Sequence, residues 1–522
     1  MRKFNVTGRC VPEEDYMVDI NGKLEQIIRL VDKRYYFTIN RARQYGKTTT
    51  LFSLTKALAS DYTCINLSFE GVGETMFERP DLFCQRFLLH ISKALENTDK
   101  DFAAAWPDES VTDFDLLSFH LDKLCKDRKI VLLIDEVDKA GNNQVFLHFL
   151  GMLRSKYLSR GNGYSFTFHS VILTGVYNIK NIKLKMIDEG TRALAPDENK
   201  IYNSPWNIAV DFEVDMSFSA IEISSMLSEY ETDHKTGMDI KAISEDIYRN
   251  TCGYPFLVSR ICQHIDEKFD KNWTQVGVQN AVQKILDEEN TLFDDIYKNL
   301  ETNANLYGFI YDTLVLGESY SFIVGNPVLG LAHMFGIIKN DNGIAVISNQ
   351  IFEKIIYEYL ISKEQTNIKK RTTTGIPAAT FIDNGRFNMQ LCLEKFAAHY
   401  YEMFNKSDSE FLEKQGRMLF LTYLRPLING RGFYHVESET RNQQRLDIVV
   451  DYGCEQFIIE LKIWHGDCRH QGAYEQLLGY MDSKNAATGY LLTFDFRNET
   501  NKRESAEWVD FDGGKRIFDV VL

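Results

Sequence analysis

Short apolar runs alternate with amphipathic stretches over the first 215 residues of the chain. In the amphipathic stretches the apolar positions recur at helical spacing, while the apolar runs have the length and composition of strands. The expected strands lie at residues 35–39, 62–67, 129–134 and 170–176, and the expected helices lie at 24–31, 47–59, 80–96 and 144–158. Such alternation is typical of a doubly wound α/β domain with a parallel sheet.

Residues 216–362 are mainly helical in pattern. Gly253-Tyr254-Pro255 suits a junction between two helices, because Pro is favoured at the first helical position. A helical stretch at 331–338 then enters a short strand, Asn340–Gly343 suits a hairpin turn, and Ile344–Ile347 returns before another helix. This order predicts a winged-helix-like unit. Its wing carries little basic charge, which favours a role in coupling domains over a role in binding DNA.

The last part of the chain follows an expected linker at residues 363–385, which is polar and contains Thr, Gly and Pro breakers. Helical patterns at 388–405 and 408–424 then precede strand-like runs at 432–438, 445–451 and 456–464. The interval between the last two runs suits a hairpin loop. If Asp451 faces Gln456 in this hairpin, Asp447 lies opposite Glu460 on one face of the sheet.

Length and composition agree with this division. A chain of 522 residues holds roughly three domains, and 44% hydrophobic and 25% charged residues are ordinary for a globular protein. The expected fold class is α/β, with a P-loop AAA-type domain at 1–215, a helical lid with a winged-helix-like region at 216–362, the linker, and an α/β domain at 386–522. The net charge of −15 means that a polyanion site needs a local basic patch or a bound metal.

The nine cysteines include no C-x-x-C pair, and most lie in apolar runs. This favours reduced, buried thiols in a cytoplasmic protein over a disulfide framework or a zinc site. The first residues lack the apolar stretch of a signal peptide, and no run of 18 apolar residues exists. We therefore expect no association with a membrane.

The first candidate site follows the expected strand at 35–39. Strand, turn, Gly46-Lys47-Thr48 and helix is the order of a phosphate-binding loop, whose N–H groups face anionic phosphates. Lys47 would reach the β- and γ-phosphates of ATP, and the Thr48 hydroxyl would lie on Mg²⁺. The usual pattern has Gly where this chain has Arg41. The alternative is a basic turn between a strand and a helix.

Two acids at the end of the strand at 129–134 complete this candidate site. The carboxyl ends of parallel strands border the crevice in which α/β sheets bind ligands. Asp135 would hold Mg²⁺ through water, and Glu136 would polarise the attacking water. Thr174, at the end of the next strand, either senses the γ-phosphate or only closes that strand, and a solvated acidic turn is the alternative for the two acids. Possible arginine fingers are Arg154 and Arg192.

The second candidate site lies in the C-terminal hairpin. Glu460 and Lys462 are two residues apart and share a face, while Leu461 points away from it. Two carboxylates, Asp447 and Glu460, with a lysine suit a Mg²⁺-dependent phosphodiesterase. The acids and the Leu461 carbonyl would bind the metal, and Lys462 would orient and activate the water. The alternative is a solvated strand with a charge pair.

Asp447, then Glu460-Leu461-Lys462, then a helix with Gln476 and Tyr480, resemble the PD-(D/E)XK nuclease superfamily. The resemblance implies a nuclease fold in which the Gln-x-x-x-Tyr helix supports the site. Leu446 replaces the Pro of the motif name. The resemblance also allows a further acid upstream, for which the sequence offers Glu413, Glu437 and Glu439.

The front half resembles the bacterial AAA-ATPase-like family that carries such a nuclease domain at its C-terminus. The matching residues are Tyr16-Met17-Val18-Asp19, Arg41-x-Arg43-x-x-Gly46-Lys47-Thr48, Leu133-Ile134-Asp135-Glu136 and Leu173-Thr174-Gly175-Val176. In that family the Arg-x-Arg form of the loop is usual. Gly253-Tyr254-Pro255 is similar to the Gly-x-Pro of related ATPases and implies that Pro255 lies near the nucleotide. The expected nucleotide-binding residues are Arg43, Gly46, Lys47, Thr48, Thr49, Asp135, Thr174 and Pro255.

Three functional interpretations follow. In the first, ATP and Mg²⁺ serve a AAA-type ATPase whose nucleotide state regulates cleavage of DNA by the C-terminal domain, in defence or mobile-element biology. In the second, the protein is a signalling or scaffold NTPase whose nuclease-like domain binds nucleic acid without cutting it. In the third, the C-terminal fold is structural only. Intact Asp447, Glu460 and Lys462 favour the first, and a homo-oligomer is possible in each.

Overall fold

The protein forms two compact units in the computed structural model. The first contains residues 1–288 and 331–337, and the second contains residues 289–330 and 338–522. The structure describes residues 2–140, 143–160, 165–176, 206–315, 318–323, 325–367, 377–383, 385–403, 413–428, 432–435, 448–453, 455–464, 467–495 and 505–522. Within these ranges, none of the helices combines the length and the apolar composition that a bilayer span requires.

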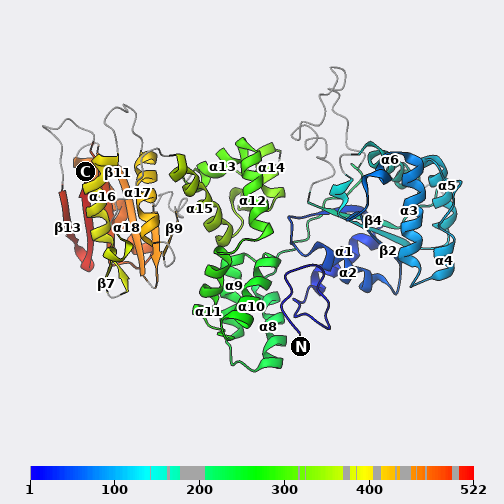
Figure 1. Cartoon of the computed structure of the whole chain (residues 1–522), viewed down its shortest axis with the longest axis horizontal. Helices are drawn as coiled ribbons and strands as arrows, with labels where there is room; N and C mark the ends of the chain where they lie inside the picture. The colour runs from blue at the N-terminus through cyan, green and yellow to red at the C-terminus, as the bar shows by residue number, and fades with distance from the viewer. Residues whose placement is uncertain are drawn as a thin grey trace, which may run out of the picture. The chain divides into compact units, whose positions relative to one another are not determined.

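A four-stranded parallel sheet forms the centre of the first unit, in the order β1-β4-β3-β2 (Figure 1). A parallel bridge between Phe37 and Val210 adds the chain near residue 210 beside β1. The strands are β1 (Tyr36–Asn40), β2 (Thr63–Ser68), β3 (Ile130–Asp135) and β4 (Ser170–Gly175). All four expected strands and the parallel sheet are confirmed.

Helices cover both faces of this sheet, as a doubly wound fold requires. Alternate strand residues point to opposite faces, so that Leu132 and Val171 enter one apolar core, while Val131 and Ile172 enter the other. The helices of the first core are α3 (Pro80–Leu95), α4 (Lys100–Ala104), α5 (Phe114–Leu124) and α6 (Gln144–Ser159), and those of the second are α1 (Asn21–Asp32) and α2 (Lys47–Leu58). Short 3₁₀ turns lie at Glu74–Phe77 and Val137–Lys139.

The helical part of the first unit contains α8 (Ala220–His234), α9 (Ile240–Thr251), α10 (Pro255–Lys268) and α11 (Gln275–Leu286). The Gly-x-Pro junction lies between α9 and α10, as the sequence predicts. Gly253 has a φ of +72°, and a Cβ atom there would lie 1.9 Å from the carbonyl oxygen of Phe218. Glycine is therefore required at this corner, and Pro255 begins α10 because its missing N–H is not needed there.

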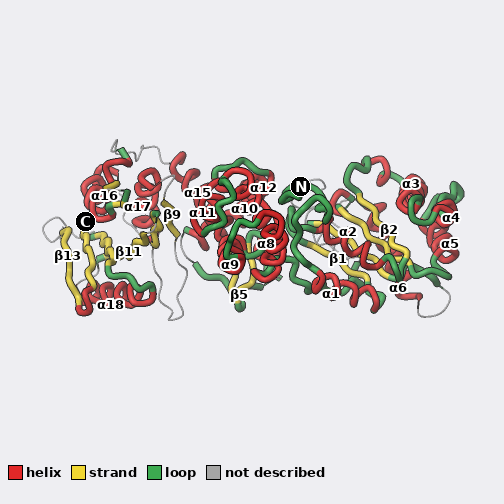
Figure 2. Tube along the Cα trace, turned by 90° about the horizontal axis from the view of Figure 1, so that it is seen from below, coloured by secondary structure: helices red, strands yellow, loops and turns green. Residues whose placement is uncertain are grey.

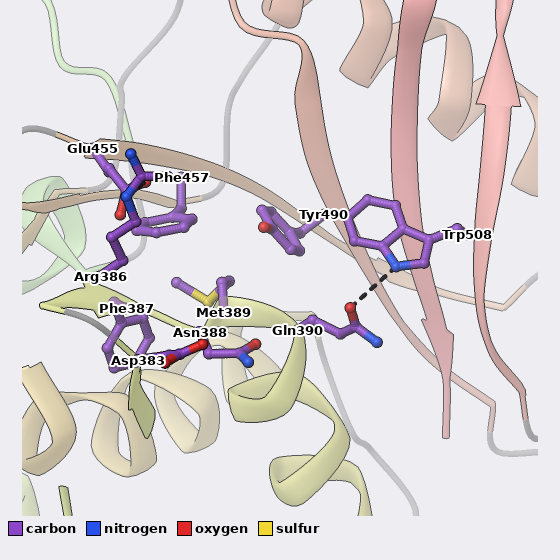
Figure 3. Close-up of a pocket in the computed structure, with 10 residues that line it drawn as sticks. All are labelled: Asp383, Arg386, Phe387, Asn388, Met389, Gln390, Glu455, Phe457, Tyr490 and Trp508. Carbon is purple, nitrogen blue, oxygen red and sulfur yellow. Dashed lines mark hydrogen bonds and ion pairs between the residues drawn. The ribbon is translucent and has the colours of Figure 1, made fainter. Parts of the chain in front are cut away.

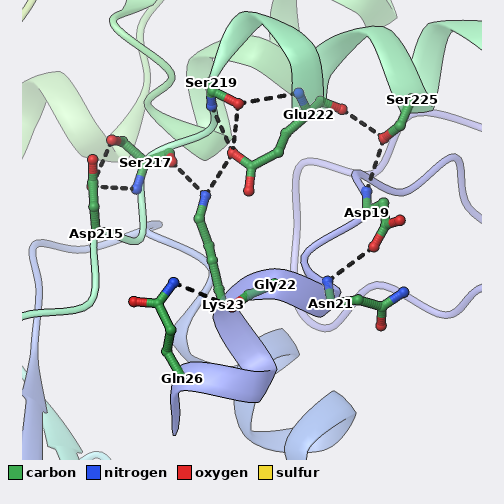
Figure 4. A network of polar contacts seen from close by, with 10 residues as sticks. All are labelled: Asp19, Asn21, Gly22, Lys23, Gln26, Asp215, Ser217, Ser219, Glu222 and Ser225. Atoms are coloured by element: carbon green, nitrogen blue, oxygen red, sulfur yellow. Dashed lines mark hydrogen bonds and ion pairs between the residues drawn. The ribbon is translucent and has the colours of Figure 1, made fainter.

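A buried lysine joins the α/β part to the helical part of this unit (Figure 4). Lys23 of α1 donates from Nζ to the Ser217 carbonyl at 2.6 Å and to the Glu222 carboxylate at 2.7 Å. Glu222 also accepts from the N–H of Ser219 and closes the capping box at the start of α8. One carboxylate thus serves both the helix cap and the junction between α1 and α8.

The second unit begins with α12 (Thr291–Thr302) and α13 (Ala304–Leu314), and α14 (Pro327–Met334) is divided between the two units. The predicted hairpin and its following helix are present as β5 (Ile338–Asp341), β6 (Ile344–Ile347) and α15 (Gln350–Asn367). Asn342 and Gly343 have φ values of 50° and 89°, as a two-residue hairpin loop requires. Helix α15 extends into the predicted linker, because the Lys363–Gln365 stretch favours helix.

A mixed six-stranded sheet, in the order β13-β14-β12-β11-β10-β9, occupies the C-terminal part. Figure 2 shows α16 and α17 on one side of this sheet and α18 on the other. The helices are α16 (Met389–Met403), α17 (Glu413–Ile428) and α18 (Asp467–Ser483), and the strands are β9 (Gly432–His435), β10 (Ile448–Tyr452), β11 (Glu455–Ile463), β12 (Thr488–Phe494), β13 (Ser505–Phe511) and β14 (Lys515–Val521).

The pattern-based expectations for this part end at the helix that holds Gln476. They do not include β12, β13 and β14, although the run Tyr490–Phe494 is apolar enough to have indicated β12. A small hairpin of β7 (Ile382–Asp383) and β8 (Arg386–Phe387), after a 3₁₀ turn at Ala378–Phe381, precedes α16. The four-part domain division stays a prediction. The residue boundaries of the two compact units, after residues 288, 330 and 337, all fall within the predicted 216–362 region.

Candidate functional site

The phosphate-loop candidate connects β1 to α2. Gln44 and Gly46 have φ values of 55° and 75°, so the loop turns through left-handed backbone at these two positions. The helix then begins at Lys47. Because the sheet is parallel, the loop lies at the same edge as the carboxyl ends of β3 and β4.

Lys47 is buried, and its ammonium group lies inside the loop. Its Nζ donates to the carbonyl oxygens of Arg41 and Ala42, each at 2.9 Å. Burial lowers the pKa of Lys47, while the nearby carboxylates of Glu136 and Asp138 act in the opposite direction. An anionic phosphate would compensate this partly desolvated cation better than two neutral carbonyl groups do.

Arg41 occupies the usual Gly position without strain, because it is not among the residues with positive φ. Its guanidinium group donates to the carbonyl oxygens of Asn40 and Val214, each at 2.8 Å. It also lies 5.5 Å from the centre of the Phe212 ring, and burial lowers its pKa. The Arg41 side chain therefore ties the start of the loop to the chain near residue 214, and glycine is not needed there.

Asp135 brings two of the predicted site residues together. The Thr48 hydroxyl donates to Asp135 Oδ2 at 2.7 Å, and the Thr174 hydroxyl donates to Asp135 Oδ1. Asp135 is buried, and its Oδ1 also accepts from the Glu136 N–H at 2.9 Å. The hydroxyl and carboxylate oxygens of Thr48 and Asp135 are hard donors of the kind that Mg²⁺ prefers, so these residues fit that metal.

Glu136 follows Asp135 in left-handed backbone, with φ 55° and ψ 40°. Such a conformation costs a non-glycine residue about 1–3 kcal/mol and is often found at functional sites. Burial, and then the charge of Asp135, raise the pKa of Glu136. Asp138 fixes the neighbouring strand end, since its carboxylate accepts from the Val176 N–H at 2.5 Å. No role for Asp138 was evident from the sequence pattern.

The helical part of the first unit contacts the loop directly. The Tyr254 hydroxyl donates to the Arg43 carbonyl at 2.5 Å, and its ring lies edge-on to Tyr45 with centroids 4.7 Å apart. Pro255 lies 3.9 Å from the position that a Cβ atom on Gly46 would take. The structure therefore places Pro255 beside the loop and adds Tyr254, which the sequence indicated only as the middle residue of Gly-x-Pro.

The remaining predicted residues of this site either lie near the same loop, lie on α6, or fall outside the residues that the structure describes. Thr49 Oγ1 accepts from the Cys10 N–H at 3.2 Å, so the first residues of the chain contact the start of α2. The Arg43 side chain is exposed. Arg154 lies on α6, and Arg192 lies outside the described residues, so the choice of an arginine finger stays open.

The C-terminal candidate site contains an ion pair between a buried carboxylate and a partly exposed lysine. Lys462 Nζ lies 2.7 Å from Glu460 Oε1, and the Glu460 side chain is 0% exposed. Asp451 pairs with Gln456, as the sequence analysis predicts, and Gln456 Nε2 donates to Asp451 Oδ1 at 2.8 Å. Asp447 lies outside the described residues, so its position opposite Glu460 stays a prediction.

Helix α18 covers the face of the sheet that carries Glu460. Tyr480 lies in an apolar core with Leu477 and Ile458, and Gln476 is half-buried on the same helix. Of the possible upstream acids, Glu437 and Glu439 lie outside the described residues, and only the backbone of Glu413, at the start of α17, is described. Within the described ranges, no group of three His, Cys, Asp or Glu side chains could hold a metal ion.

A second polar group lies on this face. His470 Nε2 lies 2.7 Å from Asp519 Oδ2, and the Tyr474 hydroxyl donates to the same oxygen at 2.5 Å.

Leu461 pairs with Leu492 in the sheet, and both side chains are buried. Adjacent strand residues point to opposite faces, so the Leu461 side chain faces away from Glu460, as expected.

A hollow of about 540 Å³ lies between the N-terminus of α16 and the sheet (Figure 3). Phe457 and Tyr490 line it together with Trp508, whose Nε1 donates to the Gln390 side-chain oxygen at 3.1 Å. Phe457 lies an odd number of residues from Glu460 along β11 and therefore faces the opposite side of the sheet. Of the predicted C-terminal site residues that the structure describes, none lines this hollow.

Comparison with known proteins identifies the first two thirds of the chain. A family model described as the AAA-like domain matches residues 24–358. No curated protein matches the sequence.

Three solved structures are similar to this chain at low sequence identity. A Walker-type ATPase of Pyrococcus abyssi is 13% identical with a TM-score of 0.48, and the match covers 68% of this chain and 99% of that one. The ORC2 protein of Aeropyrum pernix is 11% identical with a TM-score of 0.36, over 68% and 98% of the two chains. RuvB of Thermotoga maritima is 13% identical with a TM-score of 0.29, over 66% and 95%. No functional conclusion is drawn from likeness at this level.

Proposed function

The chain belongs to the AAA-like domain family, and from this premise we propose that it binds and hydrolyses ATP with Mg²⁺ and uses its nucleotide state to regulate DNA cleavage by its C-terminal part. One observation carries the ATPase half of the proposal. Lys47, Thr48, Asp135 and Thr174 lie at one edge of the parallel sheet, with Thr48 and Thr174 both bonded to Asp135.

Each of these residues has a role in the proposed reaction. The loop N–H groups and the Lys47 ammonium bind the phosphates, and Thr48 and Asp135 hold the metal. Bound Mg²⁺ offsets the charge that develops on the phosphate oxygens. Glu136 accepts a proton from the attacking water or orients that water, and Thr174 fixes the Asp135 carboxylate through its hydrogen bond.

Replacing Glu136 with Gln is expected to preserve ATP binding and to lower ATP hydrolysis by about 100-fold or more, because the base is lost while the volume is kept. The raised pKa of Glu136 adds a pH dependence. The base works only when ionised, so hydrolysis by the wild type should decline on acidification at a pH above the range of an ordinary glutamate. Steady-state phosphate release across a pH series measures both effects, and full activity in Glu136→Gln would exclude this role.

The nuclease half of the proposal rests on the ion pair between the buried Glu460 carboxylate and Lys462. A charge is costly inside a protein, and the fully buried Glu460 carboxylate lies on a strand whose other residues are largely apolar. We infer that Asp447, Glu460 and the Leu461 carbonyl hold Mg²⁺, that Lys462 orients the attacking water, and that Gln476 supports the site. The metal would supply Lewis-acid stabilisation of the phosphate oxygens.

The second candidate function is a scaffold NTPase whose C-terminal domain binds nucleic acid without cutting it. The charge balance of this part argues against tight, nonspecific DNA binding, because residues 386–522 contain 17 basic and 21 acidic side chains. The two functions make different demands on Lys462. Cleavage requires its amine at the reacting phosphate, whereas binding alone requires only a positive charge.

One assay separates these possibilities. Purified full-length protein is incubated with linear and circular DNA and Mg²⁺ or Mn²⁺, with and without ATP. The proposal expects metal-dependent cleavage in the wild type, loss of cleavage in Glu460→Ala, and cleavage that no longer responds to ATP in Lys47→Ala. DNA retention without cleavage would support the scaffold function. If the protein neither cleaves nor retains DNA, the AAA-like ATPase is left as the functional part.

A further inference from the structure

Two segments from distant parts of the sequence contact the phosphate loop. Tyr254 lies at the start of α10, and its hydroxyl donates to the carbonyl oxygen of Arg43, 211 positions earlier. Gly336 lies just after α14, and a Cβ atom on it would lie 2.8 Å from the Cβ of Ala42 and 3.9 Å from the Tyr254 ring. Ala42, Tyr254 and Gly336 therefore meet at one point.

Gly336 has to be glycine for two independent reasons. Its φ of +71° is in the left-handed region, which other residues adopt at a cost. The 2.8 Å approach to Ala42 is closer than Cβ atoms come to one another in folded proteins, and the Ala42 methyl group cannot rotate away. Any side chain at this position would displace the loop or the segment that follows α14.

The same loop peptides are held from the inside by Lys47. Its ammonium binds the carbonyl groups of Arg41 and Ala42, while Tyr254 binds the next carbonyl, that of Arg43. When Lys47 turns to an incoming phosphate, the first two carbonyl groups lose this donor, while the Arg41–Val214 and Tyr254–Arg43 bonds remain. Phosphate binding would therefore change the forces on the Tyr254–Arg43 hydrogen bond and on the contact of Gly336 with Ala42.

We propose that the contact of Tyr254 and Gly336 with the loop passes the nucleotide state of the first unit to the chain beyond residue 337. Residues 331–337 belong to the first unit, and strand β5 of the second unit begins at Ile338. A shift of Gly336 is therefore delivered to the β5–β6 hairpin through a single intervening residue, Ile337. This inference rests on the proposed ATP binding and names the residues that regulate the second unit.

Amide hydrogen exchange of full-length protein with and without ATP tests the route. In the wild type, ATP should change the exchange of residues 338–347 as well as that of the loop. Tyr254→Phe keeps the ring and removes the hydroxyl that holds Arg43. At an ATP concentration that saturates the variant, the change at residues 338–347 should fall by at least about half. Tyr248→Phe, an exposed tyrosine on α9, is the matched control and should behave as wild type.

A pair of glycine variants tests the steric part. Gly336→Ala should lower the affinity for ATP about tenfold through the forced displacement of Ala42. Gly237→Ala is the control, because Gly237 has a φ of +76° in the same unit but open space where its Cβ would lie. Thermal unfolding without nucleotide reports the backbone strain that both variants share.

The outcomes separate this inference from the function on which it rests. A wild type that does not bind ATP overturns the proposed function itself. A wild type that binds ATP but shows no exchange change at residues 338–347 overturns the route. A route that is intact in Tyr254→Phe, or equal affinities in Gly336→Ala and Gly237→Ala, shows that these contacts are only structural.

Discussion

Lys47→Ala is expected to lower the affinity for ATP by at least about 100-fold. Lys47 is the buried cation of the loop, and two charge-assisted hydrogen bonds to phosphate contribute about 1.5–3 kcal/mol each. A loss of about 3 kcal/mol corresponds to the stated factor. Titration with a fluorescent ATP analogue or calorimetry measures the affinity directly.

The Lys47→Ala variant is expected to keep the other contacts that hold the loop. Lys47 spans the loop through the carbonyl groups of Arg41 and Ala42, and its removal costs the nucleotide-free protein no more than these two bonds. The Arg41–Val214 and Tyr254–Arg43 bonds continue to hold the loop. Lys56→Ala, an exposed lysine in the last turn of the same helix, should bind ATP as the wild type does. Equal affinities in the two variants would remove Lys47 from the site.

Lys462→Ala is expected to abolish metal-dependent DNA cleavage, with a loss of about 100-fold or more if Lys462 activates the attacking water. It also removes the cation that lies 2.7 Å from the fully buried Glu460 carboxylate. The variant leaves a fully buried carboxylate without its cation, so it should unfold at a lower temperature. Loss of cleavage alone therefore does not separate chemistry from folding.

A double variant makes that separation. Glu460→Gln combined with Lys462→Met removes both charges at similar volume, and such replacements are close to neutral for stability. It should recover the thermal stability lost in Lys462→Ala without recovering cleavage. Lys484→Ala, an exposed lysine after α18, serves as the surface control. Cleavage at the wild-type rate in Lys462→Ala, or in the stable double variant, would refute the assigned site.

Local patterns predicted most of the first unit. The strand that ends at Asp135 is an unbroken apolar run, and such a run buries both of its faces only inside a parallel sheet. Parallel strands bring their carboxyl ends to one edge, so the meeting of Thr48, Asp135 and Thr174 also follows from the order of the elements. The Asn342-Gly343 turn is equally local, because it depends on the backbone preference of two residues.

Contacts between residues far apart in the sequence could not be predicted from the local pattern. Arg41 is acceptable in the loop because Val214 and Asn40 receive its hydrogen bonds and no positive φ is required, and neither condition is visible in the motif. The last three strands of the C-terminal sheet were not predicted. Their pairing, such as Leu491 with Asp519, depends on the position of strands far apart in the sequence.

The sequence by itself determined the strands and most of the helices of the first unit, where the loop and the acids lie on them, and that Glu460 and Lys462 share a face. These features follow from backbone periodicity and from residues close together in the chain. Only the tertiary structure decided that Lys47 binds the Arg41 and Ala42 carbonyls, and that Tyr254 and Gly336 contact the same loop. Those contacts exist because packing brings distant backbone within hydrogen-bond and van der Waals range, which no local pattern records.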